Sequence, residues 1–171
     1  MQATFSLVLA AASLFFGGPD QRYWMKVTCK QGGFTVDMPG TPTVQPEEKL
    51  QSRIGPIKLH MYTLASEKAF YYVSFADAPN GKMESAAETF RQARNRVLRD
   101  LKAKLVSERK ISLGKFPGSE FVAEVPQGGI VRLRTYRGVT RGYQIAIATP
   151  KEFANSPDIA HFLDSFKLIA K

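Results

Sequence analysis

The stretch 70-FYYVSFA-76 does most to define the fold of this chain. Nearly every residue in it is apolar, so it lacks the regular polar positions of a strand with one face in water. A short run of this kind is typical of a strand that is covered on both faces. We therefore expect residues 70–76 to lie inside a sheet, with other elements packed against its two sides.

The residues that follow this run predict one long amphipathic helix, about Met83 to Leu105. Ser85 and Glu88 fit a capping box near its start. Apolar side chains recur along it at spacings of three and four, which places them on one face of a helix. They are Met83, Ala86, Ala87, Phe90, Ala93, Val97, Leu98, Leu101 and Leu105. We expect this face to pack against the sheet.

Beyond the helix the sequence predicts an antiparallel meander and a closing helix. Glycine-containing turns separate four strand-like runs. These runs are Val106 to Leu113, Glu120 to Val125, Ile130 to Arg137 and Tyr143 to Thr149. Ser156 and Pro157 then supply the cap and the first-turn proline of a short helix.

Short strands are also predicted before the central run. They are Trp24 to Cys29, Phe34 to Met38, Lys49 to Ile54 and Ile57 to Ala65. The segment 32-GGFTVDMPGTPT-43 shows how the second of them ends: Pro39 cannot donate to a strand ladder, and Pro42 keeps the link extended. These prolines are therefore interpreted as ends of structure and not as a binding motif.

The first 22 residues differ from the rest of the chain. The run 5-FSLVLAAASLFF-16 is apolar apart from two serines. As a helix it would rise about 18 Å, short of the roughly 30 Å hydrocarbon core of a membrane. This length favours a secretory signal peptide over residues 1–22, although no Lys or Arg precedes the run. A disordered leader and a buried N-terminal helix are the alternatives. We expect one domain over residues 23–171.

The order of these elements, together with three segments, resembles a PsbP/DcrB-like domain. The segments are 32-GGFTVDMPGTPT-43, 105-LVSERKISLGKFPGSEF-121 and 161-HFLDSFKL-168. The chain is similar to uncharacterised exported bacterial members that pair a GF-x-V-x-x-PG-x-P start with an FLDSFKL end. The resemblance implies an α+β fold in which helices lie on both faces of an antiparallel sheet, an α/β/α sandwich in a single domain. It also implies an accessory or binding role, and it carries over no site residue.

No catalytic, cofactor-binding or metal-binding motif is visible in the sequence. The Gly-x-Ser-x-Gly turn and the glycine spacings of phosphate loops are missing. The single cysteine, Cys29, excludes an internal disulfide and a Cys-rich zinc site. His161 shares one side of the last helix with Asp158 and Asp164, and local hydrogen bonding is the simpler interpretation of the three. We therefore expect no catalysis, no cofactor and no metal.

The charge balance is strongly basic. The chain has 24 Lys and Arg against 15 Asp and Glu, a net charge of +9, which favours anionic partners. Residues 126–151 contain basic residues and no acid, and in the strand Ile130 to Arg137 the side chains of Arg132, Arg134 and Tyr136 share one face. They form a possible anion-binding surface, because an arginine fork grips a carboxylate or phosphate at two points. Solvated arginines, or a face covered by a helix, would explain the same pattern.

These observations together predict an exported, non-catalytic binding or accessory domain of unknown partner. It would be periplasmic, envelope-associated or secreted, with no transmembrane span in the mature chain. A binder of anionic surfaces (lipid or polyanion) is the first alternative, and an enzyme of undetected type is the second. Export would bring the domain into contact with envelope polymers and lipids, which disfavours nucleic acid as the partner.

Overall fold

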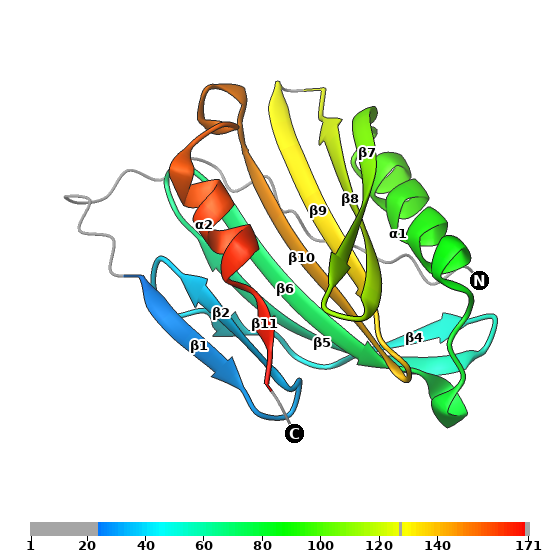
Figure 1. Ribbon diagram of the computed structural model, residues 1–171. Helices are drawn as coiled ribbons and strands as arrows, with labels where there is room; N and C mark the ends of the chain where they lie inside the picture. Colours follow the sequence, from blue (N-terminus) through cyan, green and yellow to red (C-terminus); the bar gives the residue numbers. More distant parts are fainter. Residues whose placement is uncertain (1–23, 127, 170–171) are drawn as a thin grey trace.

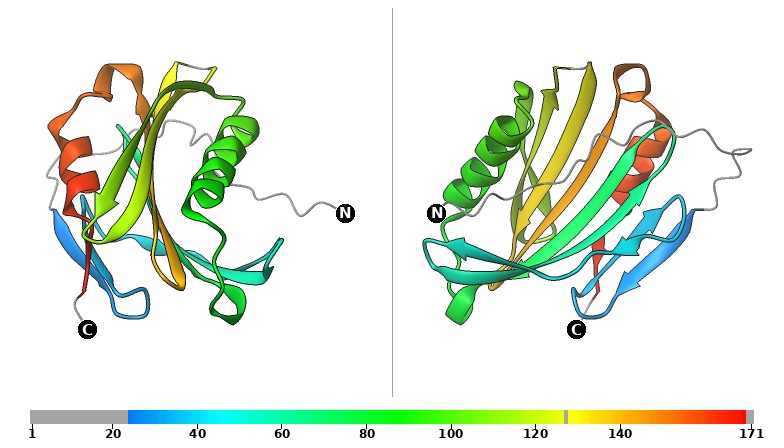
Figure 2. Two further views of the ribbon diagram at one scale, coloured as in Figure 1. Left: turned by 45° about the vertical axis from the view of Figure 1, so that its right-hand side comes forward. Right: turned by 180° about the vertical axis from the view of Figure 1, so that it is seen from behind.

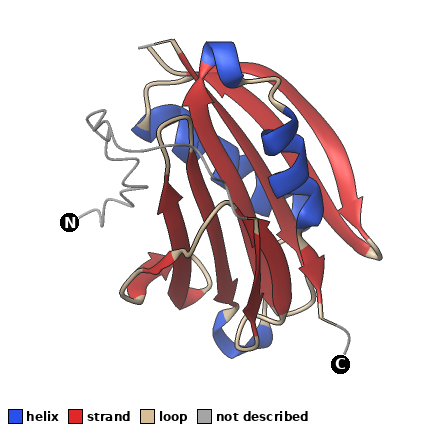
Figure 3. Ribbon diagram, turned by 90° about the vertical axis from the view of Figure 1, so that its left-hand side faces the viewer, coloured by secondary structure: helices blue, strands red, loops and turns tan. Residues whose placement is uncertain are grey.

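The computed structural model describes residues 24–126 and 128–169 of the chain (Figure 1). The leader predicted over residues 1–22 lies outside the described residues. The described part contains a three-stranded sheet, an eight-stranded sheet, and the helices α1 (Ala86–Asp100) and α2 (Pro157–Ser165). Most of it is strand (Figure 3).

The eight-stranded sheet is antiparallel throughout and has the order β3-β5-β6-β10-β9-β8-β7, with β4 paired to β5. Its strands are β3 (Thr43–Val44), β4 (Glu48–Ser52), β5 (Gly55–Ala65), β6 (Phe70–Asp77), β7 (Lys104–Leu113), β8 (Phe116–Glu124), β9 (Gly129–Arg137) and β10 (Arg141–Pro150). The predicted meander is confirmed as β7 to β10. The chain reaches it from β6 through α1, so β10 returns to lie between β6 and β9.

Strand β6 has the double burial that its sequence predicts. Residues 71–75 are all buried, and β6 lies between β5 and β10. Tyr71, Val73 and Phe75 belong to one core cluster, whereas Tyr72 belongs to another. Because successive strand residues point to opposite faces, the two clusters lie on opposite sides of the sheet.

The cluster around Tyr72 is the one that contains α1. Its other members include Ala93 and Val97 of α1 and Phe121 and Leu133 of the sheet. The predicted Ser85 cap is confirmed, since its side chain accepts a hydrogen bond from the Glu88 backbone N–H, and the helix begins at Ala86, three residues after the predicted start at Met83. It ends earlier than predicted, at Asp100.

The early end of α1 has a local cause. Lys102 adopts a positive φ of 51°, a left-handed conformation that stops a right-handed helix. Residues 104 and 105 then belong to β7. The prediction that the helix extends to Leu105 is therefore wrong, because its apolar spacing continued by chance into the next strand.

The cluster around Tyr71 holds α2 and the three-stranded sheet. That sheet has the order β1-β2-β11, from β1 (Met25–Cys29), β2 (Phe34–Met38) and β11 (Lys167–Leu168). The helix α2 is capped by Ser156, as predicted. Phe34, Phe162 and Phe166 are all buried in this cluster. Figure 2 shows the large sheet passing between α1 and α2.

Within the described part of the chain, neither helix has the length and apolar character needed to cross a membrane.

Candidate functional site

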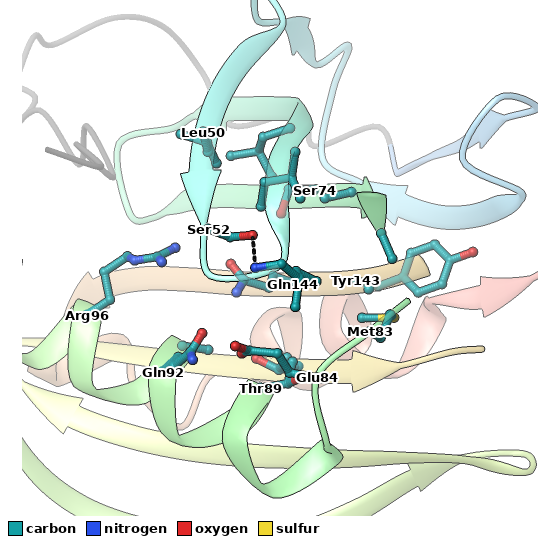
Figure 4. Close-up of a pocket in the computed structure, with 18 of the residues that line it drawn as sticks. Leu50, Ser52, Ser74, Met83, Glu84, Thr89, Gln92, Arg96, Tyr143 and Gln144 are labelled. Atoms are coloured by element: carbon teal, nitrogen blue, oxygen red, sulfur yellow. Dashed lines mark hydrogen bonds between the residues drawn. The ribbon is translucent and has the colours of Figure 1, made fainter. Parts of the chain in front are cut away.

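A groove of about 770 Å³ lies between α1 and the large sheet (Figure 4). One wall is α1, the opposite wall is the β4–β5 hairpin, and the floor is formed by β5, β6 and β10. Its volume falls within the roughly 300–1,000 Å³ of typical small-molecule sites. In Figure 4, Arg96 lies at one end and Met83 at the other, with Ser74 and Gln144 between them.

The groove exists because α1 covers only part of its side of the sheet. The helix packs against β8 and β9, where Phe121 and Leu133 meet it. Beside the helix, the floor carries Ala76 on β6 and Gly142 on β10, which are opposite each other in the ladder. A Cβ added at Gly142 would lie 3.4 Å from the Met83 side chain, so Met83 covers Gly142, and the small side chain of Ala76 leaves space on the floor.

One wall of the groove is apolar. Ile57, Leu59 and Met61 alternate along β5, and all three line the groove together with Leu50 of β4 and Tyr72 of β6. Alternate residues of a strand share a face, and the structure assigns this face of β5 to the groove. An apolar wall of this kind supplies most of the contact area in small-molecule sites.

A row of polar residues crosses the floor. Thr135 of β9 is opposite Gln144 of β10, and Gln144 is opposite Ser74 of β6. All three line the groove. Residues directly opposite one another in an antiparallel ladder point to the same face. The row therefore gives an apolar groove a band of hydrogen-bonding groups.

Thr135 is the unusual member of this row. Its side chain is only 3% exposed. Its Oγ1 is buried and has no hydrogen-bond partner among the residues that the structure describes. Buried hydroxyls are nearly always paired, because an unpaired one costs free energy. An unpaired hydroxyl in the lining of a groove is a group that a bound molecule can satisfy.

Arginines contribute the charge of the groove. Arg96 is half-buried, and burial lowers the pKa of its guanidinium, partly offset by Asp100. At the rim, Arg53 of the β4–β5 turn and Arg91 of α1 both contact the carboxylate of Glu88, at 3.5 Å and 2.6 Å. Hydrogen bonds from Arg91 and Gln92 lower the pKa of Glu88 to about 2. This bridge joins the hairpin to the helix across the groove.

The residues that the sequence singled out lie elsewhere. Arg132, Arg134 and Tyr136 occupy alternate positions of β9, on the side that faces α2. Arg134 is 13% exposed and contacts Glu120 of β8 and, at 2.7 Å, Asp164 of α2. Tyr136 is buried and stacks on Phe166. The Arg132 Nε atom is buried without a hydrogen-bond partner among the described residues.

Internal contacts therefore hold two of these three residues. Burial lowers the pKa of the Arg134 guanidinium, but the hydrogen bonds that it donates to Glu120 and Asp164 outweigh this effect and raise the pKa. Leu163 also accepts a hydrogen bond from Arg134 through its backbone carbonyl, at 2.9 Å. Arg134 thus ties β9 to α2. Anion binding by this surface stays a prediction.

The two histidines and the cysteine have structural contacts. His161 Nε2 lies 3.2 Å from the Asp37 carboxylate of β2, and its ring meets Trp24 edge-on. His60 stacks on Phe75. The Cys29 Sγ accepts a hydrogen bond from the Gly32 backbone N–H. Over the described ranges, no three His, Cys, Asp or Glu side chains are placed to hold a metal ion.

Sequence reasoning missed the groove residues Thr135, Gln144 and Arg96. The one available signal was Thr135, a polar residue in the run Val131, Leu133, Thr135 that shares the apolar face of its strand. A polar residue on a buried face is more informative than an exposed one, because it requires a partner.

Comparison with known proteins gives a likeness of fold. No family model and no curated protein matches the sequence. The structure is similar to the solution structure of cyanobacterial PsbP (CyanoP) from Synechocystis sp. PCC 6803, with a TM-score of 0.60, 10% sequence identity, and coverage of 90% of this chain and 97% of that chain. The chain therefore has a PsbP-like fold.

Proposed function

We propose that this chain is a non-catalytic binding domain whose ligand site is the groove between α1 and the β4–β5 hairpin. The observation that carries the proposal is the buried, unpaired hydroxyl of Thr135 in the groove lining. An apolar wall beside a row of polar groups supports binding of a small organic molecule. A groove with this lining can hold a molecule through apolar contact and hydrogen bonds alone, so we propose binding in place of turnover.

A neutral dye provides the direct test. N-phenylnaphthylamine fluoresces strongly when it enters an apolar site, and it carries no charge that would draw it to surface arginines. We expect saturable binding to the wild type. Ala76→Leu should remove it, because the added side chain would stand on the groove floor.

Ala160→Leu is the matched control, since Ala160 is an exposed residue of α2 and lies far from the groove lining. It should bind the dye like the wild type. Dye binding that is absent in the wild type, or that is unaffected by Ala76→Leu in a folded protein, would contradict the proposal.

We also propose that the chain belongs among the PsbP/DcrB-like proteins, that its layers form an α/β/α sandwich, and that it is exported. The PsbP-like fold, the GF-x-V-x-x-PG-x-P start and the FLDSFKL end support this. Expression in a host with Sec export should yield a mature chain that lacks residues 1–12 at least, as measured by intact mass. An intact N-terminus on protein from the cytoplasm would argue against export.

Binding of an anionic surface is the second candidate. The net charge of +9 and the buried, unpaired Nε atom of Arg132 favour it. Arg132→Gln should weaken retention on heparin or anionic liposomes at low salt. The double change of Arg132 and Arg134 to Gln should weaken it further if the fold holds. Unchanged retention of the folded Arg132→Gln protein would exclude this surface.

A further inference from the structure

The charges in the groove lining are unequal in sign. The lining contains four arginines and two acids, Arg53, Arg91, Arg96, Arg99, Asp77 and Glu84. One of the acids is neutralised by its neighbour, because Arg141 holds the Asp77 carboxylate at two points, 2.6 Å and 2.7 Å. Three of the arginines are also paired, Arg53 and Arg91 with Glu88 and Arg99 with Asp100. With these neighbours included, five arginines face four acids, so an excess of one positive charge remains.

Arg96 lies at one end of the groove, whereas Arg53 and Arg91 meet the Glu88 carboxylate at the first turn of α1. In Figure 4, Arg96 extends from α1 at the end opposite Met83, while Glu84 lies nearer the middle, beside Thr89. The Arg96 side chain is half-buried beside Tyr72, whose own pKa burial raises to about 12, so that this phenol stays neutral. A guanidinium in such a place gains more from an anion than one in water, because the local dielectric is lower.

The apolar wall is continuous with this cationic end. Leu50, Ile57, Leu59 and Met61 lie along the hairpin side of the groove, and the polar row of Thr135, Gln144 and Ser74 crosses beneath them. A ligand that matches all three features has an apolar chain and one negatively charged head. A planar carboxylate suits the planar fork of a single arginine.

We propose that the groove binds a medium-chain monocarboxylate, with its acid group facing Arg96 and the Thr135 hydroxyl and its alkyl chain on the apolar wall of the hairpin. This inference rests on the proposed function, and it adds the chemical class of the ligand. One carboxylate oxygen accepts from the guanidinium and the other accepts from Thr135. Binding thereby pairs the hydroxyl that the free protein leaves unpaired.

Displacement of N-phenylnaphthylamine by three ten-carbon ligands tests the head group. Decanoate should displace the dye at about tenfold lower concentration than decanol, the gain expected of one charge-assisted hydrogen bond. Decylamine should displace it least. Equal displacement by decanol, or stronger displacement by decylamine, would overturn the inference.

Two variants test whether Arg96 is the group that favours decanoate over decanol. Arg96→Gln should raise the concentration of decanoate needed by about tenfold and leave decanol unchanged. Arg94→Gln is the matched control, because Arg94 lies on the same helix, pairs with Glu108 and does not line the groove. Equal effects of the two variants would mean that helix charge in general, and not Arg96, attracts the acid.

Thr135→Val separates ligand recognition from stability. It removes only the hydroxyl while keeping the shape of the side chain. Decanoate binding should weaken several-fold while the midpoint of denaturant unfolding is unchanged or higher. Unchanged decanoate binding would remove Thr135 from the site.

The outcomes also separate the two proposals. If the dye does not bind the wild type at all, the groove is not a ligand site and the proposed function fails. If the dye binds and decanol displaces it as well as decanoate does, the groove is a ligand site but its ligand is not an acid.

Discussion

Arg134 and Thr149 on one side of the large sheet, and Thr135 on the other, show two different surroundings for a buried polar group. On the side of α2, Arg134 contacts both Glu120 and Asp164, and the Thr149 hydroxyl donates to the Lys68 carbonyl at 2.7 Å. On the side of α1, the Thr135 hydroxyl has no partner in the described part of the chain. Arg134 and Thr135 are consecutive residues of one strand. Arg134 and Thr149 use their polar groups to fix the fold, whereas the Thr135 hydroxyl, like the Arg132 Nε atom on the side of α2, is paired by no described residue. We propose that a ligand pairs the Thr135 hydroxyl.

The largest difference between the two sides should appear in core substitutions. Phe162→Ala should lower the free energy of unfolding by about 3–5 kcal/mol, since Phe162 is fully buried and meets Tyr71 edge-on at 5.0 Å. Leu59→Ala should cost about 1 kcal/mol, because Leu59 is half-buried and faces the groove. Denaturant unfolding measures both, and equal losses would mean that the groove side is as closely packed as the other.

The next largest loss of stability should come from breaking the ion pair of Glu120 with Arg134 beneath α2. Burial opposes ionisation of Glu120, but hydrogen bonds from Arg109 and Arg134 outweigh it and hold the pKa of the carboxyl below its usual range. Glu120→Gln should cost about 3 kcal/mol at neutral pH, because it leaves a buried arginine with one partner fewer.

The pH dependence of this variant has a definite sign. A lowered pKa means that the ionised carboxylate stabilises the fold above its usual titration range near pH 4, and that this stabilisation is lost as the pH falls through the lowered value. Unfolding curves of the wild type and Glu120→Gln should therefore converge in acid. If the difference in unfolding free energy between the two proteins stayed constant as the pH fell, Glu120 would stabilise the fold through its shape and not its charge.

A pair of threonines gives the sharpest comparison at smaller magnitude. Thr149→Val should cost about 1–2 kcal/mol, since it deprives the partly buried Lys68 carbonyl of this donor. Thr135→Val should cost nothing or stabilise the fold by about 1 kcal/mol, since it removes an unpaired buried hydroxyl. Thermal and denaturant unfolding of both variants in the same buffer measure the two changes in stability. A loss at Thr135 equal to that at Thr149 would reveal a structural bond for this hydroxyl.

Substitution of the exposed arginines of α1 should change the free energy of unfolding least. Arg99 is 71% exposed and its contact with Asp100 is between neighbours in sequence. Arg91 is also exposed and pairs with Glu88. Surface pairs of this kind contribute about 0–1 kcal/mol, so Arg91→Ala and Arg99→Ala should each cost under about 1 kcal/mol. A larger loss at Arg91 would show that the bridge between helix and hairpin supports the fold.

Much of the fold could be predicted from local patterns. The double burial of β6, the meander and the capping serines 85 and 156 all follow from alternation and capping chemistry within a few residues. The end of α1 could not, because the left-handed conformation of Lys102 has no signature in its side chain. The apolar spacing simply continued past it.

The candidate site could not be predicted from the sequence, for a different reason. Its lining comes from the β4–β5 hairpin, β6, β10 and α1, and only the pairing of β10 with both β6 and β9 brings these segments together. The role of Arg134 was hidden likewise, because the register between β8 and β9 places Glu120 opposite it. Strand register between distant segments leaves little trace in either segment alone.

The junction of β2 with α2 has a consequence for the order of folding. The Asp37 backbone N–H donates to the Ser165 hydroxyl across 128 positions of sequence, and β11 pairs with β2 beside it. Contacts so distant in sequence form late, because the loop between them must close first. During synthesis the hairpin of β1 and β2 emerges early, β5 and β6 then supply Tyr62 and Phe75 against Phe34, and the last segment completes the cover with Phe162 and Phe166. The nascent chain therefore carries an incompletely covered apolar strand until its final helix is made, and in this interval the strand is prone to aggregation.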